Sequence, residues 1–267
     1  MGGTGRASYS ELALPLVQFR TTLKPDRLLL LPVPLQTVEP QRLYRQIADQ
    51  LRALIGQGEF AVGARLPAER DLAKQLGVSR PSVREALIAL EVEGWVEVRT
   101  GSGVYVLDRS HRASAPVAPT EWGPLELIRA RRVIEGETAA IAAQTGKRKD
   151  VDAMTRAIEV MRELADRTVM LLEGDRAFHL AIVGASGNAV LIETVQNFWD
   201  SRKGPIFTRL GGYFETVSSW RSAIAEHEAI RDAVAARDAE AARAAMHEHM
   251  DKSHQRFSAS WRRAKPS

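Results

Sequence analysis

The chain contains no cysteine. Without thiols it can form no disulfide, thiolate metal site or cysteine nucleophile, and a reducing cytoplasm is the compartment we expect. Long apolar runs are also lacking, since nothing approaches the roughly 20 residues that cross a bilayer. The four leucines at 28–31 fall short of the about 7–15 apolar residues of a signal-peptide core. We therefore expect a protein without a membrane partner.

The familiar sequence signatures of enzymes are absent as well. Residues 184–187 read Gly-Ala-Ser-Gly and miss the G-x-S-x-G nucleophile elbow by one residue. The chain has no P-loop and no H-E-x-x-H motif, and Gly101-Ser102-Gly103 lacks the third glycine of a dinucleotide fingerprint. We predict that the chain is not an enzyme. A metal-dependent hydrolase is the alternative, because a metal with open coordination positions can activate water.

The chain does have enough residues and apolar surface for two modest domains. It has 267 residues, of which 45% are hydrophobic and 26% charged, and its net charge of +4 weakly favours a polyanionic partner. Shifts in composition and periodicity predict the following organisation: a partly disordered N-terminal arm at 1–36, a first domain at 37–108, a linker at 109–124, an all-helical domain at 125–261 and a tail at 262–267.

The first domain reads as three helices and a hairpin, which is the pattern of a winged helix-turn-helix. The first helix is expected at 41–57, with a buried stripe made of Leu43, Ile47, Leu51, Leu54 and Ile55. The second helix ends at Gly77, and Ser79 is a good N-cap for the third. After Gly94 the apolar period changes from 3.6 to 2, which predicts two short strands around the turn 100–103.

Positive charge is concentrated on the two helices of the turn motif. Residues 65–84 hold five cations and two anions, whereas 37–108 as a whole hold nine cations and ten anions. Arg80 and Arg84 are four residues apart and share a helix face, and arginine pairs bidentately with guanine. Ser79 and Ser82 suit phosphate at the helix start. A solvated surface face is the alternative interpretation of these arginines.

The motifs of this domain resemble the GntR family of bacterial transcription regulators. The resemblance rests on Leu66-Pro67-Ala68-Glu69-Arg70-Asp71-Leu72-Ala73, on Gly77-Val78-Ser79-Arg80-Pro81-Ser82-Val83-Arg84-Glu85-Ala86-Leu87 and on the Gly101-Ser102-Gly103 wing. It implies that the arginines at positions 70, 80 and 84 contact bases or adjacent phosphates and that Arg65 touches the DNA backbone. It also implies that the wing tip, with Thr100, Gly101 and Gly103, lies in or near the minor groove.

The second domain is predicted to be a bundle of about six helices, with breaks near Gly146, Gly187, Gly204 and Gly211-Gly212. The sequence offers no strand in this region. The fold class that we expect is therefore mainly α, with a winged helix joined to a helical bundle.

Five of the six histidines lie in this bundle. Asp175 and His179 are four residues apart, so they project from one face of a helix, and His227 lies on another helix. His247 and His249 point about 200° apart on a third helix, so only one of them can face inward. One aspartate and three histidines on facing helices suit a divalent transition metal.

The stretch 125–257 resembles the FCD ligand-binding domain of the FadR subfamily. The residues that carry this resemblance are Arg131-Arg132 with Glu135, Asp175 with Phe178-His179, His227-Glu228-Ala229-Ile230 and Met246-His247-Glu248-His249-Met250. It implies a metal bound by Asp175, His179, His227 and His249, with His247 exposed. Zinc is the metal we expect first, with nickel, manganese or iron as alternatives. It further implies that Arg131 neutralises a small carboxylate effector; a salt bridge within the bundle is the alternative.

These patterns predict a homodimeric, metabolite-responsive regulator that binds double-stranded operator DNA. Dimerisation is expected because two-fold operators mirror two-fold proteins. Repression that a small carboxylate relieves is the expected mode of action. A constitutive DNA-binding dimer with a purely structural metal is a further alternative.

Overall fold

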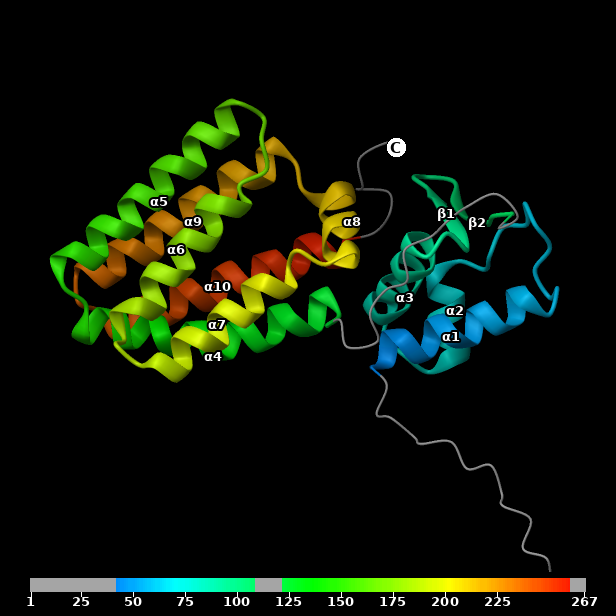
Figure 1. Cartoon of the computed structure of the whole chain (residues 1–267), viewed down its shortest axis with the longest axis horizontal. Coiled ribbons are helices and arrows are strands. Elements are labelled where there is room, and N and C mark those ends of the chain that lie inside the picture. Colours follow the sequence, from blue (N-terminus) through cyan, green and yellow to red (C-terminus); the bar gives the residue numbers. More distant parts are fainter. Residues whose placement is uncertain (1–41, 109–121, 260–267) are drawn as a thin grey trace, which may run out of the picture. The chain divides into compact units, whose positions relative to one another are not determined.

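A computed structural model describes residues 42–108 and 122–259, which belong to one compact unit (Figure 1). The expected N-terminal arm at 1–36, the linker residues 109–121 and the tail at 262–267 lie outside the described residues. Both described ranges have the predicted architecture, a winged helix followed by an all-helical bundle.

The winged helix forms where the sequence places caps and turns. Its elements are α1 (Leu43–Gly56), α2 (Glu69–Leu76), α3 (Arg80–Val92), β1 (Val96–Arg99) and β2 (Gly103–Val106). The Ser79 hydroxyl caps α3 by accepting a hydrogen bond from the Ser82 amide at 3.2 Å. Gly77 ends α2 with φ at 65°, a conformation that glycine adopts without steric cost. The strands pair antiparallel, with Val96 opposite Val106, and they form the wing.

The buried face of α1 is rotated from the predicted stripe. Its core residues are Tyr44, Ile47, Ala48 and Leu51, whereas Leu43 is 49% and Leu54 38% exposed. The buried positions keep the i, i+3, i+4, i+7 spacing of one helix face, so the periodicity was correct and its centre was wrong. The sequence gives no sign that Tyr44 and Ala48, rather than the leucines, face α3.

The bundle contains seven described helices where about six were expected. They are α4 (Pro124–Thr145), α5 (Arg148–Asp166), α6 (Leu172–Ala185), α7 (Ala189–Ser201), α8 (Pro205–Phe214), α9 (Val217–Ala235) and α10 (Ala239–Ser258). The expected break at Gly211-Gly212 is wrong, because α8 runs through it and buries Leu210, Tyr213 and Phe214. Packing of these side chains offsets the about 1 kcal/mol that a helical glycine costs.

Two helix breaks that the sequence analysis missed follow α5 and α9. The chain leaves each helix through a non-glycine residue at positive φ, Thr168 at 57° and Arg237 at 59°. Because most left-handed turns after helices use glycine, these positions carry no sequence signal.

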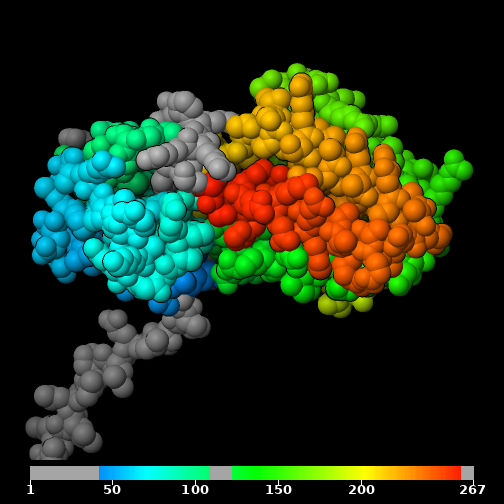
Figure 2. Space-filling view, turned by 180° about the vertical axis from the view of Figure 1, so that it is seen from behind, coloured from blue at the N-terminus to red at the C-terminus, as the bar shows by residue number. Residues whose placement is uncertain are grey.

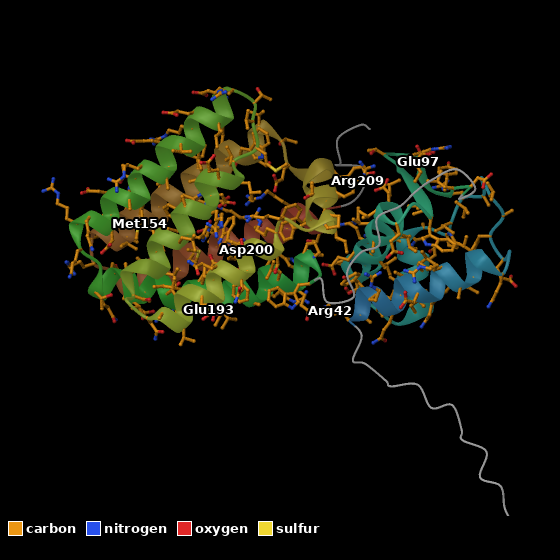
Figure 3. The ribbon with its side chains drawn as sticks, in the orientation of Figure 1. Arg42, Glu97, Met154, Glu193, Asp200 and Arg209 are labelled. Atoms are coloured by element: carbon orange, nitrogen blue, oxygen red, sulfur yellow. The ribbon has the colours of Figure 1, made fainter. Side chains whose placement is uncertain are left out.

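Close helix contacts fix the positions of the residues in the bundle core. Gly174 allows α6 to approach α5, since a Cβ there would lie 2.6 Å from Met161 Cγ. Asp175 follows Gly174 in the sequence, so the close packing of α6 on α5 also fixes the position of Asp175. The fully buried Met154 on α5 packs in the same core (Figure 3). None of the helices in the described ranges is both long and apolar enough to cross a membrane.

Glu85 on α3 is a buried carboxyl group at the start of α4. Its Oε1 accepts a hydrogen bond of 2.6 Å from the Leu125 amide, and the residue is 6% exposed. Burial raises the pKa of Glu85 to about 7, against the opposing effect of this hydrogen bond. The folded protein therefore binds a proton that the unfolded chain releases at lower pH.

Replacing Glu85 by glutamine is expected to change how stability depends on pH. The raised pKa contributes stability that is fully present below the ordinary glutamate pKa and is lost as the pH rises through about 7. Between pH 5 and pH 8 the wild type should therefore lose up to about 3 kcal/mol that Glu85→Gln retains. Urea unfolding at both pH values measures this difference. The exposed Glu59→Gln variant is the control, and parallel pH profiles for wild type and Glu85→Gln would contradict the assignment.

Candidate metal centre and DNA interface

The predicted DNA-binding residues, with one exception, lie at the surface of the winged helix. Arg65, Arg70 and Arg80 are exposed. The structure also brings the wing close to the turn motif, forming a hollow of about 230 Å³. Its polar and glycine lining comprises Arg65, Glu69, Arg70, Arg80, Gly101, Ser102 and Gly103. Cations around a hollow beside a glycine-containing turn suit the phosphate backbone of DNA.

Arg65 is held against the wing. It forms an isolated antiparallel bridge with Tyr105. A Cβ at position 103 would lie 2.5 Å from Arg65 Nε, and the φ of Gly103 is +142°. A side chain at position 103 would displace the end of the Arg65 side chain, and the positive φ of Gly103 favours glycine in the wing.

The start of α3 presents the two serines that were predicted to bind phosphate. Ser79 is exposed and Ser82 half-buried, and their hydroxyl oxygens are 2.8 Å apart. Thr100 is half-buried and Gly101 exposed at the wing turn. The contact of these residues with DNA stays a prediction.

Arg84 is the exception, because the structure buries it. It is 1% exposed, and its Nε and Nη2 donate to the two carboxylate oxygens of Glu69 at 2.7 and 2.8 Å. It also donates to the Phe257 carbonyl oxygen at 3.2 Å. The expectation that Arg84 shares an exposed face with Arg80 is wrong, because Glu69 on α2 takes its guanidinium inward. Direct contact with a base would require this bidentate ion pair to open.

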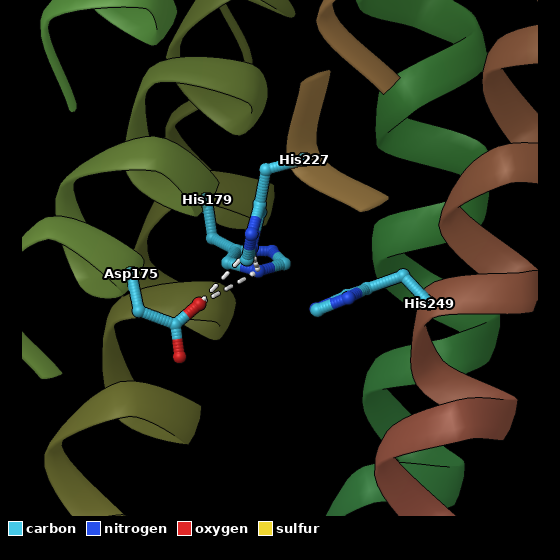
Figure 4. A group of neighbouring side chains, drawn as sticks. All are labelled: Asp175, His179, His227 and His249. Carbon is cyan, nitrogen blue, oxygen red and sulfur yellow. Dashed lines mark hydrogen bonds and ion pairs between the residues drawn. The ribbon is translucent and has the colours of Figure 1, made fainter. Parts of the chain in front are cut away.

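The four predicted metal ligands converge inside the bundle (Figure 4). Asp175 and His179 come from α6, His227 from α9 and His249 from α10. One ligand atom from each residue lies within 4.8 Å of all the others. Asp175 Oδ1 is 3.4 Å from His179 Nε2 and 3.2 Å from His227 Nε2, and the two Nε2 atoms are 3.2 Å apart.

The separations among the Asp175, His179 and His227 ligand atoms fit a metal ion, and His249 lies within 4.8 Å of each of these atoms. Ligands at about 2.0–2.2 Å from a tetrahedral zinc are roughly 3.3–3.5 Å from one another. Among the described residues, no group donates a well-formed hydrogen bond to the buried Asp175 Oδ1. An anionic oxygen without a donor beside three imidazole rings is the donor set that divalent transition metals accept.

The charges of Asp175, His227 and His249 also fit a cation, whereas Glu135 and Asp175, against the effect of burial, raise the pKa of His179. Burial would raise the pKa of Asp175, but Arg202 and the two neighbouring histidines hold it well below its ordinary value. Burial lowers the pKa of His227, and burial together with His227 and His179 lowers the pKa of His249 well below the usual range. Neutral imidazoles and an ionised carboxylate are the forms that bind metals.

Two glutamates that the sequence analysis did not assign to the site hold the far nitrogens of the histidines. Glu135 pairs with His179 Nδ1, and Glu226 Oε2 lies 2.7 Å from His249 Nδ1. Burial would raise the pKa of Glu135, but Arg131 and His179 lower it to about 2. Carboxylates in this position fix the orientation of a histidine ligand and increase its basicity.

Three arginines surround a cavity of about 50 Å³ beside the four residues: Arg131, Arg202 and Arg256. Arg131, the predicted effector residue, is bound to Glu135 at 2.6 Å. Its guanidinium also stacks over the buried Trp199 ring at 4.4 Å. The salt bridge that was the alternative role of Arg131 therefore exists, while its contact with an effector stays a prediction.

Sequence signals for the additional residues differ in strength. Glu226 is adjacent to His227, and Arg256 lies two helical turns after His249, so both were within reach of a periodicity argument. Arg202 follows α7 and donates to Asp175 Oδ2 at 2.8 Å, a contact that only the tertiary structure shows.

His247 was expected to be exposed, but it is half-buried against α4. A Cβ on Gly136 would lie 2.3 Å from His247 Nε2. Of the two histidines on α10, only His249 belongs to the cluster of potential metal ligands.

A winged helix joined to a helical bundle with a buried Asp/His cluster defines a DNA-binding regulator with a separate sensor domain. Comparison with known proteins gives the family. Residues 43–106 match the family model "Bacterial regulatory proteins, gntR family", and residues 126–252 match the FCD domain. The chain belongs to the GntR family.

Three relatives from Escherichia coli K12 illustrate this membership. The chain is 38% identical to the Uxu operon transcriptional regulator, an alignment that covers 81% of this chain and 87% of the relative. It is 35% identical to the Exu regulon transcriptional regulator, with coverages of 82% and 86%. It is 34% identical to a putative L-lactate dehydrogenase operon regulatory protein, with coverages of 81% and 87%.

The family confirms the general function predicted from the sequence. The chain is a metabolite-responsive DNA-binding transcription regulator and not an enzyme. The hydrolase alternative is thereby set aside.

Proposed function

We propose that the protein is a homodimeric repressor of the FadR subfamily that releases its operator DNA when a small carboxylate binds beside a divalent metal. The convergence of Asp175, His179, His227 and His249 next to an arginine-lined cavity carries this proposal. The bacterial cytoplasm is the compartment in which such a regulator meets both DNA and metabolites.

The four ligands determine what a bound metal offers an effector. The metal supplies a Lewis acid that attracts a carboxylate oxygen. Asp175, His179, His227 and His249 would hold the metal, and an effector carboxylate would need a coordination position beyond these four ligands. Zinc is our first choice, with nickel, manganese or iron as alternatives.

Each arginine near the cavity is paired with a carboxylate of the protein. Arg131 binds Glu135, Arg202 binds Asp175, and Arg256 binds Glu226 at 3.1 Å. An effector carboxylate therefore competes with side-chain carboxylates instead of meeting an unpaired cation. Such exchange of partners changes the contact between α6 and the end of α7 and the contact between α9 and α10. It gives the ligand the differential affinity that a change of conformation requires.

The names of the relatives are consistent with a small acid as effector. One of them is named for an L-lactate dehydrogenase operon, and lactate is a small carboxylate. These names belong to the relatives, and the acid that this chain senses is to be found by experiment.

One observation favours a second candidate function. A cavity of about 50 Å³ is far below the about 300–1,000 Å³ of typical ligand pockets. A purely structural metal in a constitutive DNA-binding dimer matches this small volume.

Thermal melting against a panel of small carboxylates, with and without a chelator, separates the two functions. A metal-anchored effector raises the melting temperature, and the chelator abolishes that rise. If the chelator lowers the melting temperature and every acid is without effect on both melting and DNA affinity, the metal is structural.

The variant His179→Ala is expected to lose the metal and keep its DNA affinity in the absence of effector. It removes a ligand from the centre of the cluster and touches no residue of the winged helix. Elemental analysis of the purified variant and a DNA gel shift measure the two outcomes. Unchanged metal content would show that the cluster is not the metal site.

Arg80→Ala tests the DNA interface. Arg80 is exposed at the start of α3, so its loss should weaken specific binding by about 1–3 kcal/mol without unfolding the domain. Titration of operator DNA at several salt concentrations measures this effect. Lys74→Ala, at an exposed position of α2, is the control. Arg52→Ala would be a poor control, because Arg52 is half-buried and binds Glu93. Equal affinities for wild type and Arg80→Ala would contradict the assignment.

A further inference from the structure

The three histidine ligands are too deeply buried to exchange with solvent directly. His179 and His227 are each 1% exposed and His249 5%. The adjoining cavity of about 50 Å³ holds only a few water molecules, at about 10–15 Å³ for each. A metal ion and a carboxylate therefore need a route through the bundle.

A much larger hollow of about 890 Å³ lies along α9 and α10. Figure 2 shows the face of the bundle on which these two helices reach the surface. The hollow lies within the about 300–1,000 Å³ range of small-molecule pockets. Its lining is mostly short or polar, with Ser218, Ser222 and Ala225 from α9 and Glu248, Lys252 and Gln255 from α10.

The hollow and the inner cavity share three residues: Ser219, His249 and Arg256. His249, a member of the metal cluster, therefore lines both the hollow and the inner cavity. Between the two spaces Arg256 Nη1 donates to Glu226 Oε1 at 3.1 Å, and Glu226 also binds His249 Nδ1. Glu226 is 9% exposed, so this ion pair is largely shielded from water.

We infer that the α9–α10 hollow is the route by which the metal and the carboxylate effector reach the cluster, and that the Arg256–Glu226 ion pair closes it. Arg256 is the cation that lines both the hollow and the inner cavity, and it exchanges Glu226 for the entering carboxylate. This inference rests on the proposed metal site and assigns its access. The positive charge of Arg256 also offsets the repulsion between an anionic effector and the carboxylates of Glu226 and Glu248, which line the hollow.

A second approach exists beside Asp175, whose side chain is 18% exposed. It is covered by Arg202, which binds Asp175 at 2.8 Å and lies 3.8 Å from Glu215. Arg202 therefore contacts two carboxylates, one of them in the metal cluster. Entry through the hollow, by contrast, requires only the Arg256–Glu226 ion pair to open.

The exchange kinetics of Zn²⁺ alone test the route. Ala225→Phe places a bulky ring in the hollow, and Ala235→Phe makes the same change at an exposed position of α9 outside it. Uptake of Zn²⁺ by the metal-free protein and its release to a chromogenic chelator are measured by stopped flow. An obstructed route slows both rates by the same factor, and the dissociation constant stays unchanged.

We expect Ala225→Phe to slow both rates about tenfold and Ala235→Phe to leave them unchanged. Arg256→Gln should accelerate both rates about tenfold, the change expected from loss of one charged hydrogen bond. Equal rates for Ala225→Phe and Ala235→Phe would overturn the route and indicate the approach beside Asp175. An effect on release alone would also overturn it, since that is a change of affinity. A wild type that binds no Zn²⁺ would instead refute the proposed metal site.

Discussion

Arg84→Ala should destabilise the winged helix domain by about 3–5 kcal/mol, because it leaves the buried Glu69 carboxylate without its bidentate partner. Glu69 is 7% exposed and its remaining cation, Arg80, is 3.5 Å away and solvent-exposed. Arg80 therefore compensates only in part. Urea unfolding followed by circular dichroism measures the loss, with Arg80→Ala as the matched variant on the same helix.

The double variant Glu69→Gln, Arg84→Met distinguishes a lost charge pair from lost packing. Replacing a buried ion pair by neutral groups of similar volume is often close to neutral, so the double variant should recover most of the stability. If Arg84→Ala unfolds within about 0.5 kcal/mol of the wild type, the ion pair does not form in solution. Arg84 would then be available to DNA, as its sequence position suggested.

These two arginines show how far the sequence could predict the DNA interface. Their spacing places Arg80 and Arg84 on one face of α3, and the periodicity of this helix was read correctly. The pattern of one helix does not show that Glu69, fifteen residues earlier on α2, accepts both donors of Arg84. A helix face is exposed only where no neighbouring helix covers it, and that is a property of the tertiary structure.

In the bundle, the sequence indicated the residues of the candidate metal cluster but not the residues that orient them. The cluster of Asp175, His179, His227 and His249 was predicted because each residue type and spacing carries information. Spacing alone left His247 and His249 undecided, and the family resemblance selected His249. Glu135 and Glu226, which orient the histidines, are among many acidic residues of similar appearance in an alanine-rich helical sequence.

Helix ends were predictable where glycine or proline marks them and obscure elsewhere. Gly146 and Gly204 border helices as expected. The helices α5 and α9 instead end before Thr168 and Arg237, which adopt positive φ without glycine. Glycine is also an ambiguous signal, since Gly211 lies within α8, and burial decides whether a helix continues.

Removing the metal is expected to lower the melting temperature of the bundle by on the order of 10 °C. A metal present at 1,000 times its dissociation constant stabilises the folded state by about 4.1 kcal/mol, and 1 kcal/mol corresponds to about 2–4 °C in a protein of roughly this size. Without the cation, the buried Asp175 oxygen and the neutral His227 and His249 are left without a ligand that satisfies them. Calorimetry of metal-loaded and chelator-treated protein measures the shift.

His247→Ala is the matched control for this measurement, because His247 lies two residues from His249 on α10 and outside the cluster. It should bind the metal and lose stability on chelation as the wild type does, whereas His249→Ala should be insensitive to the chelator. Both variants remove an imidazole from the same helix, so a difference between them isolates coordination from packing. If chelation shifts neither the wild type nor His247→Ala, the four side chains form a hydrogen-bonded core without a metal, and the effector must be held by the arginines alone.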